Sequence, residues 1–263
     1  MTDPRPIVSI QNVSRNFGGV VAVDNCTFEV PAGSITALIG PNGAGKTTLF
    51  NIVAGFMPPS GGQVILDGVD VTGLPAHRLF RHGLVRTFQI PRMFERMTVL
   101  ENLMLVPAQQ RGENLLANWL AWSRVRSEEQ KIRERAGEVL EFLQITHVAG
   151  QLAGELSGGQ KKLVELGRTM MTDPKVVLLD EPGAGVNPTL LAKLCEDIRR
   201  LNRERGYTFC IIEHDMDLIA KLCHPVVVMV EGSVLMTGTM AEVRANREVQ
   251  EAYLGGSLAE LAP

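Results

Sequence analysis

A glycine-rich stretch that follows the apolar run 35–39 contains the residue types that bind phosphate groups. It fits the pattern G-x-x-x-x-G-K-[ST], in which glycines let successive backbone N–H groups turn inward around an anion. The helical pattern after it adds the partial positive charge of a helix N-terminus. A solvated glycine turn is the alternative, but the strand–loop–helix context favours a phosphate loop. The expected nucleotide-binding residues are Gly40, Pro41, Asn42, Gly43, Ala44, Gly45, Lys46, Thr47 and Thr48.

Four residues have specific expected roles in phosphate chemistry. Lys46 is expected to reach the β- and γ-phosphates, and the Thr47 hydroxyl to bind Mg²⁺. An apolar run begins at residue 176 and ends in the carboxylates Asp180 and Glu181. This pattern predicts a buried parallel strand whose C-terminal end lies at the ligand-binding edge of the sheet. Asp180 is then expected beside Mg²⁺, and Glu181 where it orients water toward the γ-phosphate. Alternatively, the acidic pair only begins a turn.

Composition narrows the class of protein. The chain has 263 residues, 45% hydrophobic and 21% charged, which is enough for one large α/β domain with a subdomain. A net charge of −3 argues against a nucleic-acid partner. The apolar runs are too short to span a membrane, and the N-terminus does not resemble a signal peptide. The cysteines lack C-x-x-C spacing and are expected to be reduced and buried: Cys26, Cys195, Cys210 and Cys223.

The hydrophobic pattern predicts two kinds of sheet and a helical insert. Strands at 7–10, 20–30 and 63–68 are expected to be antiparallel. From residue 176 onward, apolar strands alternate with amphipathic helices, as a parallel sheet requires. Between residues 90 and 155 the strand pattern disappears. Capping-box spacings at Thr98 and Ser127 predict two helix starts there, and the stretch 115–122, with Trp119 and Trp122, is either a packed helix or a partner-facing patch.

The order Leu156-Ser157-Gly158-Gly159-Gln160 precedes a helical run at 161–171. With this motif the chain resembles an ATP-binding cassette (ABC) ATPase, since these residues are that family's signature. The resemblance covers essentially the whole chain. It implies an α/β P-loop NTPase fold of the ABC type, with a mixed or parallel core sheet, an antiparallel β subdomain and an inserted α-helical subdomain. The implied cofactors are ATP and Mg²⁺.

The resemblance also assigns roles to single residues. Phe17 stands where an aromatic ring stacks on adenine, Gln89 where a glutamine contacts water, Mg²⁺ and the membrane-facing loop, and His214 where a histidine contacts the γ-phosphate. Glu181 would polarise the attacking water. Alternatively, Phe17 is an ordinary core aromatic, Gln89 a solvated loop residue and His214 a helix cap.

One phosphate loop and one signature imply a single cassette. Its expected parts are a catalytic core with the β subdomain at 1–89 and 172–263, and a helical subdomain at 90–171. Family members pack head to tail in pairs, so Ser157, Gly158, Gly159 and Gln160 would contact the nucleotide of a second cassette. The loop 183–187 would lie at that interface, where Asn187 replaces the usual Asp and leaves the cross-site electrostatics open.

Four strings narrow the resemblance to the ATP-binding subunit of branched-chain amino acid importers, of the longer cassette type: 17–23, 85–94, 213–216 and 250–255. This implies a cytoplasmic energy-coupling ATPase held at the inner face of the membrane by integral permease subunits and served by a periplasmic solute-binding protein. A related small polar solute fits equally. The alternatives are a urea or amide importer, the ATPase of a lipopolysaccharide-type exporter, and a soluble ABC ATPase outside transport.

A short segment after Gln89 offers a candidate docking surface for the permease. Arg92, Met93, Phe94 and Met97 combine one cation with apolar side chains, which suits a groove for a short helix. The alternative is that the three apolar residues belong to the core of the helical subdomain.

Overall fold

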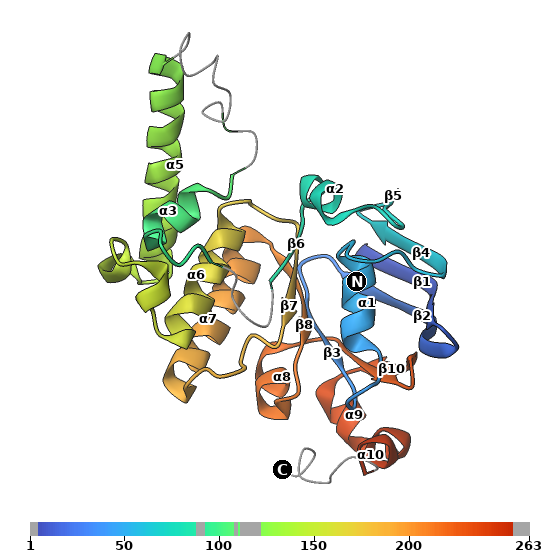
Figure 1. The fold of residues 1–263 in the computed structure, drawn as a ribbon. Coiled ribbons are helices and arrows are strands. Elements are labelled where there is room, and N and C mark those ends of the chain that lie inside the picture. Colours follow the sequence, from blue (N-terminus) through green and yellow to red (C-terminus); the bar gives the residue numbers. More distant parts are fainter. Residues whose placement is uncertain (1–4, 88–92, 108–109, 111–121, 255–263) are drawn as a thin grey trace. The chain divides into compact units, whose positions relative to one another are not determined.

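The computed structural model describes residues 5–87, 93–107, 110 and 122–254. The chain divides into two compact units, which are treated separately below. The core unit comprises residues 1–89, 175–184 and 195–263, and the helical unit comprises residues 90–174 and 185–194. Figure 1 shows the elements of both.

The core unit begins with a four-stranded antiparallel sheet in the order β2-β1-β4-β5. Its strands are β1 (Pro6–Phe17), β2 (Val20–Pro31), β4 (Gly61–Leu66) and β5 (Val69–Asp70). β1 extends well beyond the predicted 7–10, because register shifts between Ile10 and Val13 interrupt the alternation on which the prediction depended. The antiparallel pairing of the first segment is confirmed.

A second sheet of six strands has the order β10-β9-β3-β8-β7-β6. Five strands are parallel to one another: β3 (Ile35–Ile39), β6 (Leu84–Arg86), β7 (Val176–Asp180), β8 (Thr208–Ile212) and β9 (Val226–Val230). The edge strand β10 (Ser233–Gly238) is antiparallel to β9, as the predicted hairpin requires. Every residue of β3, β7 and β8 is buried, which explains their uninterrupted apolar sequences.

The remaining elements are helices. Six lie wholly or partly in the core unit: α1 (Lys46–Val53), α2 (Ala76–Arg81), α7 (Pro188–Arg205), α8 (Met216–Leu222), α9 (Met240–Ala245) and α10 (Arg247–Leu254). In the described ranges no helix is both long and apolar enough to cross a membrane.

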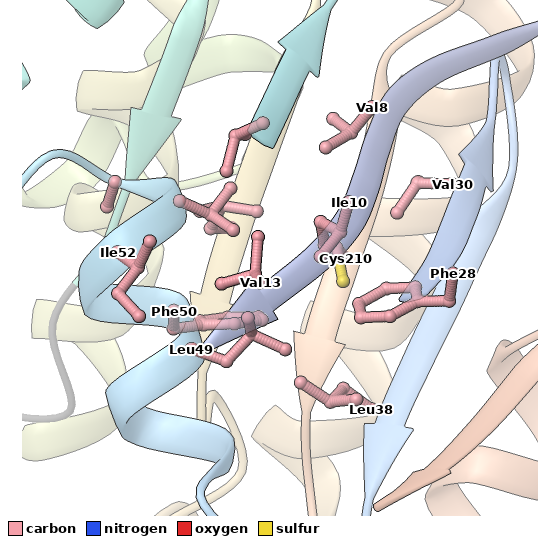
Figure 2. Close-up of a cluster of buried hydrophobic side chains, with 14 of the residues drawn as sticks. Val8, Ile10, Val13, Phe28, Val30, Leu38, Leu49, Phe50, Ile52 and Cys210 are labelled. Carbon is pink, nitrogen blue, oxygen red and sulfur yellow. The ribbon is translucent and has the colours of Figure 1, made fainter. Parts of the chain in front are cut away.

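Helix α1 is fixed by a hydrophobic cluster that also includes both sheets (Figure 2). Leu49, Phe50 and Ile52 of α1 pack in the same cluster as strand residues of β1, β2, β3 and β8, among them Ile10 and Leu38. Because α1 directly follows the glycine-rich loop, this packing holds the loop's C-terminal end in place.

The cysteines are only partly as predicted. Cys26, Cys210 and Cys223 are buried, whereas Cys195 is half-buried on one side of α7. Burial raises the pKa of Cys210 to about 12, so its thiol stays protonated and unreactive at neutral pH.

The helical unit contains α3 (Val99–Met104), α5 (Trp122–Phe142) and α6 (Gly158–Met170), with short 3₁₀ turns at 146–148 and 153–155. The capping box at Thr98 is confirmed, since Thr98 and Glu101 exchange both bonds. The predicted start at Ser127 is wrong, because α5 begins at Trp122 and Ser127 lies inside it. Ser and Gln also occur on exposed helix faces, so the spacing alone cannot locate a start. Trp119 lies outside the described residues.

Candidate nucleotide-binding site

The glycine-rich loop needs glycine where other backbones approach it closely. Gly40 and Gly45 have φ angles of 151° and 92°, in the region that side chains disfavour. A Cβ at Gly40 would lie 2.0 Å from the carbonyl oxygen of Met229, and one at Gly45 would lie 2.3 Å from that of Ala22. The loop is therefore enclosed by β9 and β2, and no larger residue fits at either position.

Lys46 opens α1 and folds back over the loop. Its Nζ donates hydrogen bonds to the carbonyl oxygens of Gly40 (2.7 Å) and Pro41 (2.9 Å). The ammonium group thus lies across the loop that is expected to hold the phosphates, where an anion would exchange these neutral acceptors for a charged one. Thr47, in the first helical turn, is exposed.

Asp180 ends β7 in a buried ion pair that the sequence analysis missed. Its Oδ2 lies 2.7 Å from Nη2 of Arg86, and the two side chains are only 11% and 6% exposed. Arg86 also donates to Oδ1 of Asn51 at 2.5 Å and lies near the rings of Phe50 and Phe56. A lone arginine in the otherwise apolar strand β6 was the available signal, because a buried cation requires an anion.

Glu181 combines a strained backbone with a partly exposed carboxylate. Its φ of 48° is uncommon for a residue other than glycine. Its N–H donates to the carbonyl of Ile212 at 2.9 Å, and its own carbonyl accepts from Ala184 at 3.1 Å. Glu181 therefore does begin a turn, and its Oε1 also lies 3.7 Å from Nδ1 of His214. The two sequence interpretations are compatible.

His214 presents an exposed imidazole rather than capping a helix. Its side chain is 61% exposed. The N-cap of α8 is Asp215, whose carboxylate accepts from the N–H groups of Asp217 and Leu218 at 3.0 Å. The helix-cap interpretation of His214 is therefore wrong.

These groups meet at a cavity of about 700 Å³ in the core unit. Of the predicted residues, Gly40, Pro41, Asn42, Gly43, Ala44, Lys46, Glu181 and His214 line it, whereas Gly45, Thr47, Thr48 and Asp180 are not in the lining. Glu251, Ala252 and Tyr253 of α10 form part of the wall, which no sequence pattern predicted. The pocket has a glycine-rich floor and the Lys46 ammonium group, which suit a polyphosphate, and the carboxylates of Glu181, Glu213, Glu231 and Glu251 also line it.

Phe17 ends β1 with a ring that is 43% exposed, so the core interpretation is wrong. The Arg15 guanidinium lies over this ring, with its carbon 4.8 Å from the ring centroid. Such a contact fixes the ring and leaves part of its surface open for a flat ligand.

The protein oxygen atoms near the loop suit Mg²⁺ only when a bound phosphate supplies further oxygen ligands. Thr47 and Asp180 offer one hydroxyl and one carboxylate, the hard ligands that Mg²⁺ prefers. Among the described residues no group of three His, Cys, Asp or Glu side chains can hold a metal ion. The residues fit an ion whose remaining ligands are phosphate and water. Gln89, the third predicted ligand, lies outside the described residues.

In the helical unit, Ser157 is the N-cap of α6. Its hydroxyl accepts from the N–H of Gln160, and the Gln160 side chain accepts from the N–H of Ser157 at 2.9 Å. The helix therefore starts three residues before the predicted 161 and includes both glycines. A Cβ at Gly158 would make an ordinary contact with the carbonyl oxygen of Gly185 at 3.9 Å, whereas a Cβ at Gly159 would meet Leu190 of α7 at 1.9 Å.

Asn187 caps α7, because its Oδ1 accepts from the N–H of Leu190 at 3.0 Å. Asp would make the same bond, so the local structure does not depend on which of the two is present.

The candidate docking segment is partly described. Phe94 is 56% exposed, and Met93 and Met97 are half-buried, so the core interpretation is wrong for Phe94. Buried Asn102 exchanges hydrogen bonds with the backbone of Phe94 at 2.9 and 3.0 Å. This residue, not singled out from sequence, fixes the loop that presents the ring. Arg92 lies outside the described residues.

Comparisons with family models and with known proteins all match ATP-binding proteins of transporters. A family model for ABC transporters matches residues 23–184, and one for the branched-chain amino acid ATP-binding cassette transporter matches residues 233–259. The chain is 40% identical over 251 residues to a high-affinity branched-chain amino acid transport ATP-binding protein of Pseudomonas aeruginosa, covering 95% of this chain and 98% of that protein. It is 42% identical to a probable one of Archaeoglobus fulgidus, covering 97% and 98%.

Solved structures agree with the fold. A nucleotide-free ATP-binding cassette from an ABC transporter matches with a TM-score of 0.82 and 37% identity, covering 95% of this chain and 99% of that one. The ADP conformation of such a cassette matches with a TM-score of 0.81 and 36% identity, over the same shares.

The Arg86–Asp180 pair yields a stability prediction. Arg86→Met keeps much of the packing but leaves the Asp180 carboxylate buried without its arginine. Removing one partner of a buried pair costs about 3–5 kcal/mol, so urea unfolding should show a loss of that order. Lys175→Met is the control, because it breaks the exposed Lys175–Asp67 pair (2.6 Å), which solvent screens, and should cost much less. Equal losses would contradict the buried pair's role.

The two signature glycines yield a second prediction. Alanine in place of a helical glycine stabilises a protein by about 1 kcal/mol where it fits. Gly158→Ala should therefore stabilise the chain, whereas Gly159→Ala must displace Leu190 and should lose that gain or destabilise. Thermal unfolding of the nucleotide-free variants compares them. A gain in both would mean that Leu190 moves at no cost.

Proposed function

We propose, from the premise that this chain belongs to the ABC transporter family of ATP-binding cassettes, that it hydrolyses ATP to drive solute import through a membrane complex. The observation that carries the proposal is the single cavity lined by the glycine-rich loop, Lys46, Glu181 and His214. A phosphate site needs only the first two. A carboxylate and an imidazole at the same cavity add what hydrolysis requires.

We assign the catalytic roles to groups of the core unit. Transfer of the γ-phosphoryl group depends mainly on positioning and on neutralising negative charge. Lys46 exchanges its two carbonyl acceptors for phosphate oxygens, and the loop N–H groups bind the remaining charge. Glu181 orients water, and His214, 3.7 Å away, contacts the γ-phosphate. Thr47, Asp180 and Gln89 would hold Mg²⁺, which would supply further charge neutralisation when bound.

Adenine recognition is assigned to Phe17, at the end of β1. Arg15 lies over the ring, so the base stacks on the part of the ring surface that Arg15 leaves open. Stacking of this kind supplies affinity with little discrimination among purines, since every purine offers a flat face.

The proposal includes a second cassette. Residues 90–171 form the proposed helical subdomain, and its signature residues Ser157, Gly158, Gly159 and Gln160 contact the nucleotide of the other subunit. The first N–H groups of α6 have no acceptor within the helix, so they suit an anion. Asn187 then lies near the interface as the cap of α7 and contributes no charge there.

The proposed solute is a branched-chain amino acid. The relatives described above carry that transport in their names, which favours it over lipid export and amide import. The solute reaches permease subunits and a periplasmic binding protein rather than this chain. Phe94, with its partly buried methionine neighbours, offers the apolar contact for a short cytoplasmic helix of the permease. The chain thereby acts at the inner face of the membrane.

The central test uses Glu181→Gln in the assembled transporter. This change keeps the side-chain shape but removes the carboxylate, so ATP hydrolysis and leucine uptake into proteoliposomes should both fall by about 10²-fold or more. ATP should still bind, and the variant should dimerise with ATP in sedimentation. Glu248→Gln, an exposed residue of α10 outside the cavity lining, is the control and should retain most activity. Normal hydrolysis by Glu181→Gln would exclude the assigned role.

Adenine stacking has its own test. Phe17→Ala should raise the Kd for ATP roughly tenfold or more, because base–aromatic stacking contributes about 1–3 kcal/mol. Titration with ATP and GTP measures the change. Val20→Ala, an apolar residue near the same hairpin that is 67% exposed, should leave both affinities unchanged. An unaltered Kd in Phe17→Ala would remove the ring from the nucleotide site.

A further inference from the structure

Glu213 is a buried carboxylate in the lining of the cavity, and none of the roles assigned above uses it. It directly follows β8 and is only 3% exposed. Its Oε1 accepts a hydrogen bond from the backbone N–H of Gly183 at 2.7 Å, and its Oε2 accepts from the N–H of His214 at 3.2 Å. One side chain therefore binds two backbone segments at once.

Those two segments carry the groups proposed for hydrolysis. Gly183 lies two residues after Glu181, in the turn that Glu181 begins. The N–H of Glu181 donates to Ile212, the residue before Glu213. Two hydrogen bonds thus connect the end of β7 with the end of β8, and a third joins Glu213 to its neighbour His214. The Glu181 and His214 side chains lie 3.7 Å apart.

We infer that Glu213 is a positioning residue, which holds the turn of Glu181 and the backbone of His214 at the separation that hydrolysis requires. The inference rests on the proposed ATPase function. Both Glu213 oxygens already accept N–H groups, so Glu181 remains the residue that orients water. Glu213 acts through the backbones that it binds.

A carboxylate is the side chain that this position requires. Two N–H donors converge on it, and a carboxylate offers only acceptors. Glutamine would direct an NH₂ group at one donor, and an apolar residue would leave the N–H groups of Gly183 and His214 without this acceptor. Hydrogen bonds to an ionised acceptor are also about twice as strong as neutral ones, and burial strengthens them further.

The test compares Glu213→Gln with Asp197→Asn in the full chain. Asp197, on α7, is equally buried at 3% exposure and pairs with Arg200 at 3.7 Å, but it does not line the cavity. Both changes neutralise one buried carboxylate, so both should lower the Tm. Only Glu213→Gln should accelerate amide hydrogen exchange at Gly183, by about tenfold or more in the nucleotide-free protein, as expected for a lost bond to a charged acceptor.

Steady-state kinetics supply the second readout. In Glu213→Gln, kcat for ATP should fall by about 10- to 100-fold with KM changed less than about twofold, since the phosphate loop is untouched. Asp197→Asn should keep the wild-type kcat. A Glu213→Gln variant with a lowered Tm but normal kcat and normal Gly183 exchange would overturn the inference. If the wild type itself does not hydrolyse ATP, the proposed function fails, while the exchange at Gly183 still tests the bond.

Discussion

The parallel register of β3, β8 and β7 determines where the groups of the candidate site lie. Leu38 of β3 is opposite Ile212 of β8, and Ile212 is opposite Asp180 of β7. The residues that follow these positions therefore leave the sheet at the same edge: the glycine-rich loop, then Glu213 and His214, then Glu181. A shift of one residue in either pairing would move the loop by about 3.3 Å relative to the carboxylates, which is longer than a hydrogen bond. The buried strands are mostly apolar, with Thr36, Thr208 and Asp180 as polar exceptions, so packing in the cluster of Figure 2 contributes to this register.

Two buried carboxylates at that edge are stabilised in different ways. Asp180 pairs with the guanidinium of Arg86, whereas Glu213 binds backbone N–H groups. In an ion pair, a divalent cation can take the place of the arginine, because both of these partners are cations. Backbone N–H groups that bind a carboxylate are part of the fold, so they cannot leave it. The first arrangement suits a residue that must respond to a ligand, and the second suits a residue that must stay in place.

The features that sequence reasoning recovered are local in the chain. The glycine-rich loop, the capping box at Thr98 and the apolar strands ending in acids each depend on residues a few positions apart, so their spacing specifies them. The missed features join distant residues. Arg86 and Asp180 are 94 positions apart, and Gly183 and Glu213 are 30 apart. Nothing in a single sequence distinguishes Glu213 from a solvated acid until β7 and β8 are paired. The error at Ser127 has the opposite cause, because a short local pattern also fits the exposed face of a continuous helix.

The signature segment combines a stable start of helix α6 with backbone N–H groups that have no acceptor within the helix. Ser157 and Gln160 satisfy each other's backbone N–H groups, so the start of α6 is stable without a ligand. The capping bonds leave the N–H groups of Gly158 and Gly159 without intrahelical acceptors, which follows from helix geometry. A Cβ at Gly159 would overlap the Leu190 side chain unless Leu190 moved, whereas one at Gly158 would make only an ordinary contact at 3.9 Å. Packing within the helical unit therefore favours glycine at the second position. The first glycine has no such constraint, so any requirement for a small residue there must come from what approaches the helix end from outside.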